Sequence, residues 1–366
     1  MARLKIYFIV PYPLTWVAGQ RLRFEHFLPI LKENNMDYKI SPFFSEKFYK
    51  FLYSNGKMFK KTIYTIIAYF KRCLDLVYIA SYDVVFIYRE TTPFRGVLFE
   101  WICKKILKKK IIYDFDDAIF LPAVASANKL VAFLKNASKV YSAVKLSDLV
   151  FVGNQYLAAH ISHLNSNIKI LPTLVNTESY KRDNIFRDQS KENVVLGWIG
   201  SSTTRHYIEG MANILREVYF ETGKKIKVNI IGVGSFPIQD VPVKFLPWGL
   251  ETEIENLSQI DIGLMPLTDD AWSWGKCGGK ILQYMALSIP VVASPIGVNK
   301  NLIQDGENGF LVSTEKEWIT KLGYLIHDRE LRLSMGRQAR KTIVEKHSIL
   351  KYKSFFINEI RKVILI

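Results

Sequence analysis

The sequence predicts an α/β fold built from two Rossmann-like domains. Short segments rich in Val, Ile and Leu alternate with helical segments along the 366 residues, which is typical of parallel sheets. A polar, charge-rich stretch at 177–193 divides the chain near its middle, as a linker would. The length also suits two domains better than one core.

Each predicted domain has its own series of elements. In the first half we expect strands at 4–10, 84–88, 110–113 and 149–152, and helices at 22–34, 94–107 and 132–146. In the second half we expect strands at 194–199, 228–231, 262–265 and 291–293, and helices at 207–222, 279–287, 317–327 and 331–345. The predicted boundaries are 1–176 for the N-terminal domain, 177–192 for the linker, 193–346 for the C-terminal domain and 347–366 for a final helix. That helix either packs back on the N-terminal domain, which we favour, or caps the second domain.

The charge is distributed unevenly. The net charge is +16, and residues 1–176 contain 25 Lys and Arg against 12 Asp and Glu. In residues 177–366 the corresponding numbers are 25 and 22. This asymmetry predicts an anionic partner for the first half: nucleic acid, an acidic membrane surface or a phosphorylated substrate.

Cysteine and histidine usage indicates neither disulfides nor a metal centre. Cys73, Cys103 and Cys277 lie far apart, which argues against a disulfide framework. The histidines show no metal-ligand spacing, so we expect no metal and no cofactor. No uncharged apolar run reaches the roughly 20 residues that span a bilayer, and no signal peptide is recognised. These observations predict a cytoplasmic protein.

Basic and aromatic residues are interleaved over 44–81. The basic residues are Lys47, Lys50, Lys57, Lys60, Lys61, Lys71 and Arg72, and the aromatic ones include Phe48, Tyr49, Phe51, Tyr53, Phe59, Tyr64 and Phe70. Such a mixture suits the surface of an anionic membrane, which would place the protein at the inner membrane surface. A surface helix with solvated lysines explains the pattern equally well.

The most informative segment, 272–286, reads WSWGKCGGKILQYMA. It follows a predicted strand and opens a helix, so Gly278 and Gly279 are expected at a helix N-terminus, where backbone amides and the dipole attract phosphate. Lys276 and Lys280 add positive charge within one turn of that point. The segment therefore predicts a diphosphate site. A glycine-rich turn with incidental lysines is the alternative.

Two passages follow this segment in order. SIPVVASPIG at 288–297 is a helix end, a buried strand and a sharp turn, and DGENGFLV at 305–312 leads into a short strand. Together with the glycine-bearing loop, they resemble the retaining glycosyltransferases of the GT-B fold, group four. The sequence looks closer to a subgroup with the signature W-x-x-GKCG-x-K-x-LQYMA. The resemblance implies two Rossmann-like domains that face an interdomain cleft, with the nucleotide-sugar donor bound by the second.

The sequence departs from the family at its E-x7-E motif. That motif would fall on Gly275 and Gln283, and neither is Glu. Gln283 takes the place of the second Glu and can still hydrogen-bond a ribose hydroxyl. The acidic contact with the donor sugar is lost, and Lys276 or neighbouring backbone of the donor-binding loop, such as that of Cys277, is expected to substitute.

The resemblance implies further donor contacts in the second half. A Gly/Ser/Thr turn follows the strand at 194–199 and contains Gly200, Ser201 and Arg205, which are expected at the donor phosphate. An ordinary helix N-cap is the alternative. Trp248 lies where the family packs a loop on the nucleobase, so it either stacks there or fills the core.

In the first half, Gly19 and Arg21 follow the first strand, where the family has a glycine-rich loop that faces the donor sugar. Arg21 and Arg23 would then point toward the cleft. The alternative is a plain helix start with solvated arginines.

Carboxylates gather at the end of another predicted strand, at Asp114, Asp116 and Asp117. Open α/β sheets bind ligands at such strand ends. We expect Asp116 and Asp117 to contact the acceptor hydroxyl or the donor sugar, and with Lys276 they are the candidate catalytic residues. A DxD-type metal site is the rival interpretation, although GT-B enzymes generally need no metal.

The resemblance implies transfer of a sugar from a nucleoside-diphosphate sugar to an acceptor hydroxyl, with retention, in polysaccharide or lipid-linked glycan assembly. The acceptor would be a glycan or a lipid-linked molecule. A nucleotide-sugar epimerase of the same fold is a second hypothesis. A nucleic-acid-binding protein without catalytic activity is a third, but the chain has no recognised DNA- or RNA-binding motif, so we expect no nucleic-acid partner.

Overall fold

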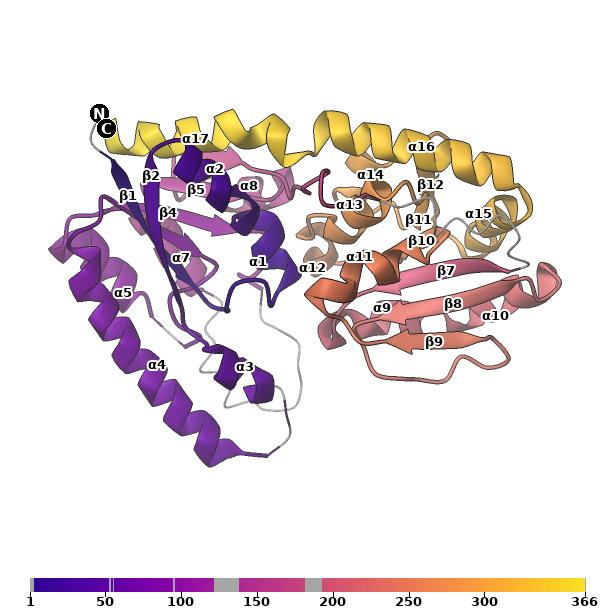
Figure 1. Cartoon of the computed structure of the whole chain (residues 1–366), viewed down its shortest axis with the longest axis horizontal. Coiled ribbons are helices and arrows are strands. Elements are labelled where there is room, and N and C mark those ends of the chain that lie inside the picture. Colours follow the sequence, from indigo (N-terminus) through magenta and orange to yellow (C-terminus); the bar gives the residue numbers. More distant parts are fainter. Residues whose placement is uncertain are drawn as a thin grey trace. The chain divides into compact units, whose positions relative to one another are not determined.

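The computed structural model describes residues 3–52, 54, 56–94, 96–121, 138–181 and 193–365 (Figure 1). The chain divides into two compact units. Unit 1 comprises Met1–Thr173, Gly275–Cys277 and Tyr352–Ile366, and unit 2 comprises Leu174–Trp274 and Gly278–Lys351. Each unit contains one six-stranded sheet whose neighbouring strands are parallel. The predicted α/β class with two parallel-sheet domains is therefore confirmed.

The sheet of unit 1 has the order β2-β1-β3-β4-β5-β6. Its strands are β1 Leu4–Val10, β2 Met36–Pro42, β3 Val84–Tyr88, β4 Lys110–Phe115, β5 Leu149–Val152 and β6 Ile168–Ile170. Every residue of β3 and β5 is buried, as expected for strands covered on both faces. The strand order reverses between β1 and β3, and open α/β sheets bind ligands beside the carboxyl ends of strands at such a point.

The helices of unit 1 differ from the predicted ones. They are α1 Ala18–Arg23, η1 Glu25–Phe27, α2 Leu28–Glu33, α3 Glu46–Leu52, α4 Met58–Ile79, α5 Leu98–Trp101, η2 Ile102–Ile106, α7 Lys139–Leu146 and α8 Gln155–Ile161. The single helix predicted at 22–34 is three short ones. The break follows from Pro29, which lacks an amide hydrogen and occupies the first turn of a new helix instead of the interior of a longer one.

Two more helix predictions in this unit need correction or fall outside the described residues. The helix predicted at 94–107 begins only at Leu98, after Gly96 with its left-handed φ of 93°. Of the helix predicted at 132–146, residues 132–137 lie outside the described part of the chain.

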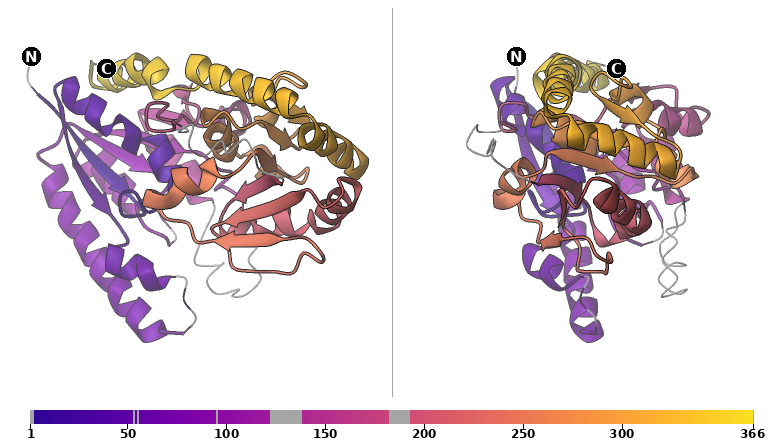
Figure 2. Two further views of the ribbon diagram at one scale, coloured as in Figure 1. Left: turned by 45° about the vertical axis from the view of Figure 1, so that its right-hand side comes forward. Right: turned by 90° about the vertical axis from the view of Figure 1, so that its right-hand side faces the viewer.

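The sheet of unit 2 has the order β12-β11-β10-β7-β8-β9, which reverses between β7 and β10. Its strands are β7 Val194–Ile199, β8 Ile226–Ile231, β9 Val243–Leu246, β10 Ile262–Met265, β11 Val291–Ala293 and β12 Gly309–Leu311. The helices are η4 Ser202–Thr204, α9 Arg205–Glu209, α10 Ala212–Glu221, α11 Leu250–Ser258, α12 Ala271–Trp274, α13 Gly279–Ala286, α14 Asn299–Leu302, α15 Glu315–His327 and α16 Arg329–Lys346. Helices flank the sheets of both units (Figure 2). The helix predicted at 207–222 is two, because the chain turns at Gly210.

Alternate residues of the unit 2 strands enter two separate cores. Leu196 and Trp198 belong to one cluster, whereas Ile199 belongs to the other. Ile230 and Ile231 divide in the same way. This is the period-two pattern of a strand buried on both faces, and it holds each strand end in a defined register.

The predicted linker and the final helix can be compared with the two units. Residues 182–192, most of the predicted linker, lie outside the described residues, and unit 2 begins at Leu174. The last helix is α17 Ile349–Leu365, and its residues from Tyr352 onward belong to unit 1. There Phe356 stacks on Phe27, with ring centroids 4.2 Å apart.

Candidate functional site

Arg89 is the first residue after β3, beside the point where the strand order of unit 1 reverses. Its φ of 57° is left-handed, which costs a non-glycine residue about 1–3 kcal/mol and persists only where the surroundings impose it. The backbone on both sides is held: the Arg89 amide donates to the Asp114 carbonyl at 2.8 Å, and the Tyr113 hydroxyl donates to the Arg89 carbonyl at 2.5 Å. The guanidinium is thereby aimed at the loop after β4.

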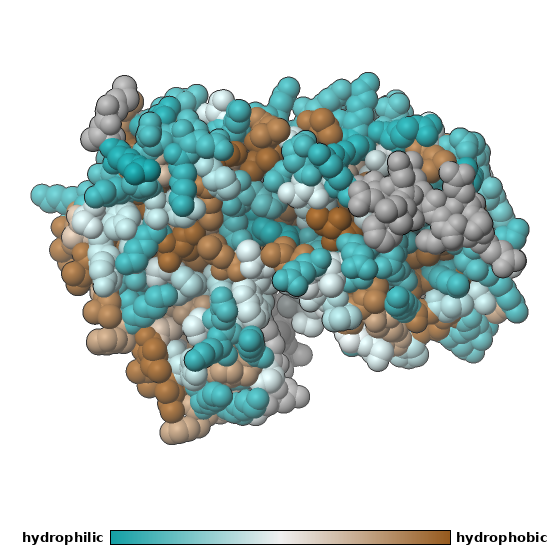
Figure 3. Space-filling model, viewed as in Figure 1, coloured by the Kyte–Doolittle hydropathy of each residue, from teal (hydrophilic) through white to brown (hydrophobic). Residues whose placement is uncertain are grey.

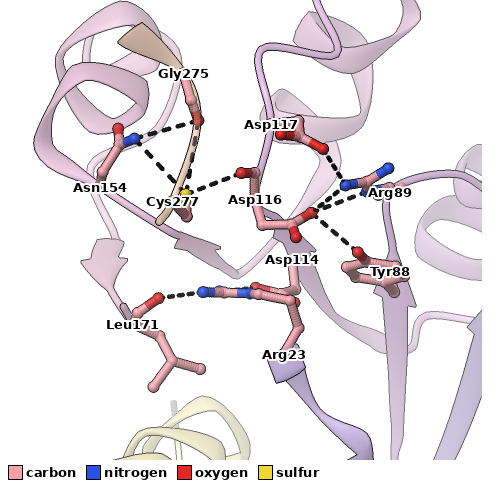
Figure 4. Close-up of polar contacts among 10 residues, drawn as sticks. All are labelled: Arg23, Tyr88, Arg89, Asp114, Asp116, Asp117, Asn154, Leu171, Gly275 and Cys277. Atoms are coloured by element: carbon pink, nitrogen blue, oxygen red, sulfur yellow. Dashed lines mark hydrogen bonds and ion pairs between the residues drawn. The ribbon is translucent and has the colours of Figure 1, made fainter. Parts of the chain in front are cut away.

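That loop carries Asp116 and Asp117 (Figure 4). The Asp116 Oδ1 atom accepts hydrogen bonds from the Tyr88 hydroxyl at 2.9 Å, from Arg89 Nε at 2.9 Å and from Arg89 Nη2 at 2.7 Å. Asp117 forms an ion pair with the same Nη2 atom. One guanidinium therefore holds both predicted carboxylates.

The two carboxylates have pKa values shifted in opposite directions. Burial raises the pKa of Asp116, but Arg89, Arg23 and the hydrogen bond from Tyr88 outweigh it, so the net pKa lies below the ordinary value. For Asp117, burial and the charge of Asp116 raise the pKa above its ordinary value, against Arg89 and Lys276. Asp117 is thus the more basic carboxylate, and such separated pairs are typical of acid–base sites.

A second ion pair lies beside this cluster. Arg23 on α1 pairs with Asp114 and also donates to the Leu171 carbonyl, and both charged side chains have no exposed surface. Arg23 therefore does not point toward a ligand, and that prediction was wrong. Arg21 is also buried, at 7% exposed, so the alternative of solvated arginines at this helix start is wrong as well.

The loop Gly275–Cys277 belongs to unit 1, although its neighbours in sequence belong to unit 2. Asn154 donates from Nδ2 to the carbonyls of Gly275 at 3.2 Å and Lys276 at 3.0 Å. The Cys277 thiol donates to the Asp116 carbonyl at 2.8 Å. These contacts carry the loop over the ends of β4 and β5, next to the carboxylates (Figure 4).

Two glycines allow the close approach of these segments. A Cβ at Gly153 would lie 2.2 Å from the Cys277 sulfur, and one at Gly275 would lie 2.6 Å from the Ala118 Cβ. A Cβ on Gly19 would lie 3.3 Å from both Asp116 Oδ2 and the Tyr88 hydroxyl oxygen. Gly19 therefore lies at the same cluster.

Unit 1 thus brings together five of the predicted site residues: Gly19, Asp116, Asp117, Lys276 and Cys277. Sequence reasoning missed Tyr88, Arg89 and Asn154. A signal for Arg89 was present, because it directly follows the strand predicted at 84–88. Asn154 follows β5 and caps α8 by accepting a hydrogen bond from the Leu157 amide, so its second role toward the loop is a tertiary feature.

A cavity of about 160 Å³ adjoins this cluster. Its lining residues are Pro11, Tyr12, Arg89, Glu90, Ile119, Lys139 and Val140. Lys139 forms an ion pair with Glu90 and donates to the Thr92 carbonyl at 2.6 Å, so its ammonium group is fixed in the wall. The cavity combines apolar surface with oriented charges, as small polar ligands require.

In unit 2, α13 begins at Gly279, after Gly278 with a φ of 70°. Glycine is needed at 278 for two reasons: the backbone is left-handed, and a Cβ would lie 2.4 Å from Leu302 Cδ1. Lys280, in the first turn, places its Nζ atom 4.1 Å from the centroid of the Trp198 ring. A glycine-opened helix start and a positioned lysine therefore occur where the sequence predicted them.

Gln283 belongs to a buried hydrogen-bond network. Its Nε2 atom donates to the Tyr180 hydroxyl at 3.0 Å, and that hydroxyl donates to Glu253. Trp248 Nε1 donates to the other carboxylate oxygen of Glu253 at 2.7 Å. The network joins the two predicted residues Gln283 and Trp248 through two that the sequence analysis missed, Tyr180 and Glu253.

The turn after β7 is built as a helix cap. Ser201 and Thr204 form a reciprocal capping box at the start of η4. At Gly200, a Cβ would lie 2.2 Å from the Trp198 ring. Arg205 pairs with Glu209 one turn later, at 2.7 Å. The alternative of an ordinary N-cap describes this turn, and a donor contact by Gly200, Ser201 or Arg205 stays a prediction.

Within the described residues, no group of three or more His, Cys, Asp or Glu side chains is placed to hold a metal ion. The expectation of a reaction without metal stays a prediction.

Among the same residues, no helix is both long and apolar enough to cross a bilayer.

Comparisons with known proteins agree on a glycosyltransferase. Residues 193–328 match the family described as "Glycosyl transferases group 1". The chain is 24% identical over 402 residues to the "Uncharacterized glycosyltransferase MJ1069" of Methanocaldococcus jannaschii, which covers 97% of this chain and 99% of that protein.

Similar solved structures span nearly the whole chain. Anabaena HepE in complex with UDP-glucose has a TM-score of 0.70 at 15% identity. The superposition covers 98% of this chain and 100% of the HepE chain. A glycosyltransferase from Rickettsia africae has a TM-score of 0.66 at 13% identity, covering 99% and 98%. The lipopolysaccharide outer core galactosyltransferase WaaB has a TM-score of 0.61 at 15% identity, covering 98% and 99%. The fold is GT-B, as predicted, and the family match supports a glycosyltransferase.

Proposed function

We propose that this chain is a retaining glycosyltransferase that transfers a sugar from a nucleoside-diphosphate sugar to an acceptor hydroxyl, in polysaccharide or lipid-linked glycan assembly. The match of 193–328 to a glycosyltransferase family supports the reaction class. The similarity to HepE, whose structures contain UDP, glucose or UDP-glucose, supports a nucleotide-sugar donor.

One observation carries the proposal: the segment after β10 enters α13 through Gly278, with Lys276 two residues before that glycine in the sequence and Lys280 in the first turn of the helix. Unit 2 reverses its strand order between β7 and β10, so this segment leaves the sheet at the edge where ligands bind in such folds. As the bond to the anomeric carbon breaks, negative charge develops on the leaving diphosphate. Lys276, Lys280 and the first amides of α13 are assigned to stabilise it.

The network around Glu253 is assigned to the nucleoside. Trp248 is partly exposed and tethered through its indole nitrogen, so its ring is held in one position, and we assign it to stack on the base. Gln283 is oriented by Tyr180 and takes the position of the ribose contact that the family resemblance implies.

The cluster of unit 1 is assigned to the acceptor. The acceptor oxygen forms the new bond to the anomeric carbon, and its proton passes to the leaving phosphate or to Asp117. Asp117 is suited to receive it because its pKa is raised, whereas Arg89 and Tyr88 help to lower the pKa of Asp116. The neighbouring cavity, with the fixed ammonium group of Lys139, is the proposed acceptor pocket.

The donor site is tested by thermal shift with UDP-, GDP-, ADP- and TDP-sugars. One nucleotide class is expected to raise the melting temperature of the wild type, and Lys276→Ala and Lys280→Ala are expected to lose that response. Lys316→Ala, an exposed lysine on α15, is the matched control and should respond like the wild type. If both site variants respond as fully as the control, the donor site lies elsewhere.

The reaction class is tested with the nucleotide sugar so identified. Transfer to an acceptor, with the anomeric configuration of donor and product compared by NMR, is expected to show retention. Interconversion of the nucleotide sugar without acceptor would identify an epimerase instead. A product with the opposite anomeric configuration would contradict the proposed retention.

A further inference from the structure

α4 turns its apolar face outward. The helix has 22 residues, and nine large apolar side chains on it are exposed. They are Met58, Phe59, Ile63, Ile66, Ile67, Phe70, Leu74, Val77 and Tyr78. Phe59 is 81% exposed, Val77 73% and Phe70 66%. Their spacing of three and four residues places them along one side of the helix, and Figure 3 shows hydrophobic residues along its outer edge.

The opposite side of α4 is buried and partly charged. Ala68, Arg72, Asp75 and Ile79 face the unit. Arg72 donates to Asp75 at 2.8 Å and to the Thr91 carbonyl at 3.0 Å, and Asp75 accepts from the Tyr7 hydroxyl at 2.7 Å. A surface helix normally buries its apolar stripe and exposes its charges. In α4 the buried side includes an ion pair, and a long apolar stripe is exposed instead.

This orientation is specified by the structure. If α4 rotated to bury the apolar stripe, Arg72 and Asp75 would lose their partners, and Tyr7 and Ser41 would lose theirs. Because unpaired polar groups are costly in the interior, the buried network keeps the stripe outward. A contiguous exposed apolar surface of this kind is typical of a docking site.

The charges beside the stripe are positive. Asp75, which is buried, is the only acidic residue of α4, whereas Lys60 and Lys71 are exposed on the helix and Lys57 precedes it. At the other end, Lys109 donates to the Ala80 carbonyl at 2.8 Å, which attaches the lysine-rich segment 104–110 to the end of α4. Exposed apolar residues also occur there, at Ile106 in that segment and at Leu98 and Trp101 on α5, which precedes it.

We propose that α4 is a monotopic docking face that lies in the surface of an anionic lipid bilayer, with its apolar stripe in the acyl boundary and its lysines at the headgroups. Helices with an apolar face flanked by Lys bind membrane surfaces in this way. Lys is depleted at the cores of protein–protein interfaces. A second copy of this chain, with a net charge of +16, would bring like charges together. The lipid surface is therefore the favoured occupant.

The proposal goes beyond the proposed function and is tested without any enzymatic measurement. The full-length protein is mixed with vesicles of phosphatidylcholine alone or of phosphatidylcholine with phosphatidylglycerol, and binding is measured by co-sedimentation. Cys73 is exposed on α4, so an environment-sensitive fluorophore attached there reports insertion of this helix in particular. We expect at least tenfold tighter binding to the anionic vesicles and a blue shift of the label.

Variants separate the apolar and the electrostatic contributions. The triple variant Ile66→Ser, Phe70→Ser, Val77→Ser removes exposed side chains, so its melting temperature should equal or exceed that of the wild type while binding is lost. Lys57→Glu with Lys60→Glu should weaken binding to anionic vesicles at least tenfold. Tyr324→Ser, Val344→Ser and Leu350→Ser remove apolar residues of unit 2 that are also exposed, at 52%, 45% and 53%, and should leave binding unchanged.

Three results would overturn the proposal. If the triple variant binds vesicles as well as the wild type does, the apolar stripe is not the membrane-binding surface. If the wild type binds both vesicle types with equal affinity, it does not require an anionic surface. Dimerisation of the wild type in light scattering, abolished by the triple variant and accompanied by no vesicle binding, would assign the stripe to a second copy. Each can occur whether or not the chain transfers sugars.

Discussion

Arg89 holds a single oxygen of Asp116 with two hydrogen bonds, from Nε at 2.9 Å and from Nη2 at 2.7 Å. The second nitrogen is shared with Asp117, so this one cation balances two carboxylates. The arrangement requires the left-handed backbone at Arg89, because it is that conformation which turns the side chain from the end of β3 toward the loop after β4.

Replacing Arg89 should therefore leave two carboxylates without their shared partner. Arg89→Ala is expected to lower the free energy of unfolding by about 2–4 kcal/mol, since breaking a largely buried ion pair leaves uncompensated charge. Urea unfolding measures this. Arg3→Ala breaks an exposed pair with Asp37, with Arg3 59% exposed, and should cost less than about 1 kcal/mol. Equal costs in the two variants would contradict the role given to Arg89.

The packing of Gly153 on Cys277 makes a second prediction. Gly153→Ala places a Cβ 2.2 Å from the Cys277 sulfur, so the loop Gly275–Cys277 must move. Overpacking of this kind costs about 1–3 kcal/mol. We expect sugar transfer to fall at least tenfold, because Lys276 moves with the loop.

The control restores the space that the new methyl group takes. In Gly153→Ala with Cys277→Ala, the nearest contact of the new Cβ becomes that with the Cβ of residue 277, at 3.2 Å. The double variant should recover both stability and activity relative to Gly153→Ala. Failure to recover either would show that the conflict lies elsewhere.

Glu253 accepts hydrogen bonds from both Tyr180 and Trp248. Glu253→Ala removes the carboxylate that accepts from both, which should cost about 1–3 kcal/mol at the buried Tyr180 and less at the partly exposed Trp248. It should also weaken nucleotide binding, because Trp248 and Gln283 lose their positions together. Isothermal titration with the preferred nucleotide measures the affinity.

Glu255, two residues later on α11, provides the matched control. Its side chain is exposed, and Glu255→Ala should leave both stability and nucleotide affinity unchanged. If Glu253→Ala binds the nucleotide as tightly as the wild type, the nucleoside does not bind at this network.

Two histidines should make the protein less stable in mild acid. Burial lowers the pKa of His26 and of His347 to about 4, and the Nδ1 atom of each is buried with no hydrogen-bond partner among the described residues. The unfolded chain takes up a proton near the ordinary pKa of about 6.5, whereas the folded protein does so only near 4. Their contribution to stability is therefore complete above about pH 6.5 and is lost as the pH falls toward 4.

The slope is the measurable quantity. Between those pH values each histidine should reduce the free energy of unfolding by up to about 1.4 kcal/mol per pH unit as the pH falls. Urea unfolding at about pH 7 and about pH 5 gives the slope for the wild type. His26→Gln and His347→Gln should each flatten it. Variants that keep the full wild-type slope would assign the acid sensitivity to other groups.

The strands could be placed from the sequence because their signal is local. β1, β3, β5, β7, β10 and β11 have the predicted bounds, since buried parallel strands read as short continuous runs of apolar residues. The edge strands β2, β6 and β9 were missed. Only one residue of β2 besides its first is buried, and no residue of β6 or β9 is, so their composition is too mixed for that signal.

The start of α13 was predictable for a similar reason. Gly278 can adopt the left-handed backbone conformation that precedes this α-helix, and Lys276 and Lys280 are its near neighbours in sequence. The partnership between Arg89 and Asp116 was not predictable in this way. It depends on β3 pairing with β4, which sets Tyr88 opposite Asp114 across the sheet.

α4 shows the same division. From the sequence, its interleaved basic and aromatic residues allowed two interpretations, a membrane-facing surface or a surface helix with solvated lysines. The buried partners of Arg72 come from Ser41 and Thr91, on other elements, and they turn the charged side inward.

The sequence by itself therefore determined the α/β class, the central strands and the glycine-opened helix, because these depend on periodicity and backbone sterics within a few residues. The tertiary structure alone decided which charges are neutralised at Arg89, that Arg23 is buried, and that α4 exposes its apolar side. These depend on pairing between segments tens of residues apart, and the cost of burying an unpaired charge decides among the alternatives.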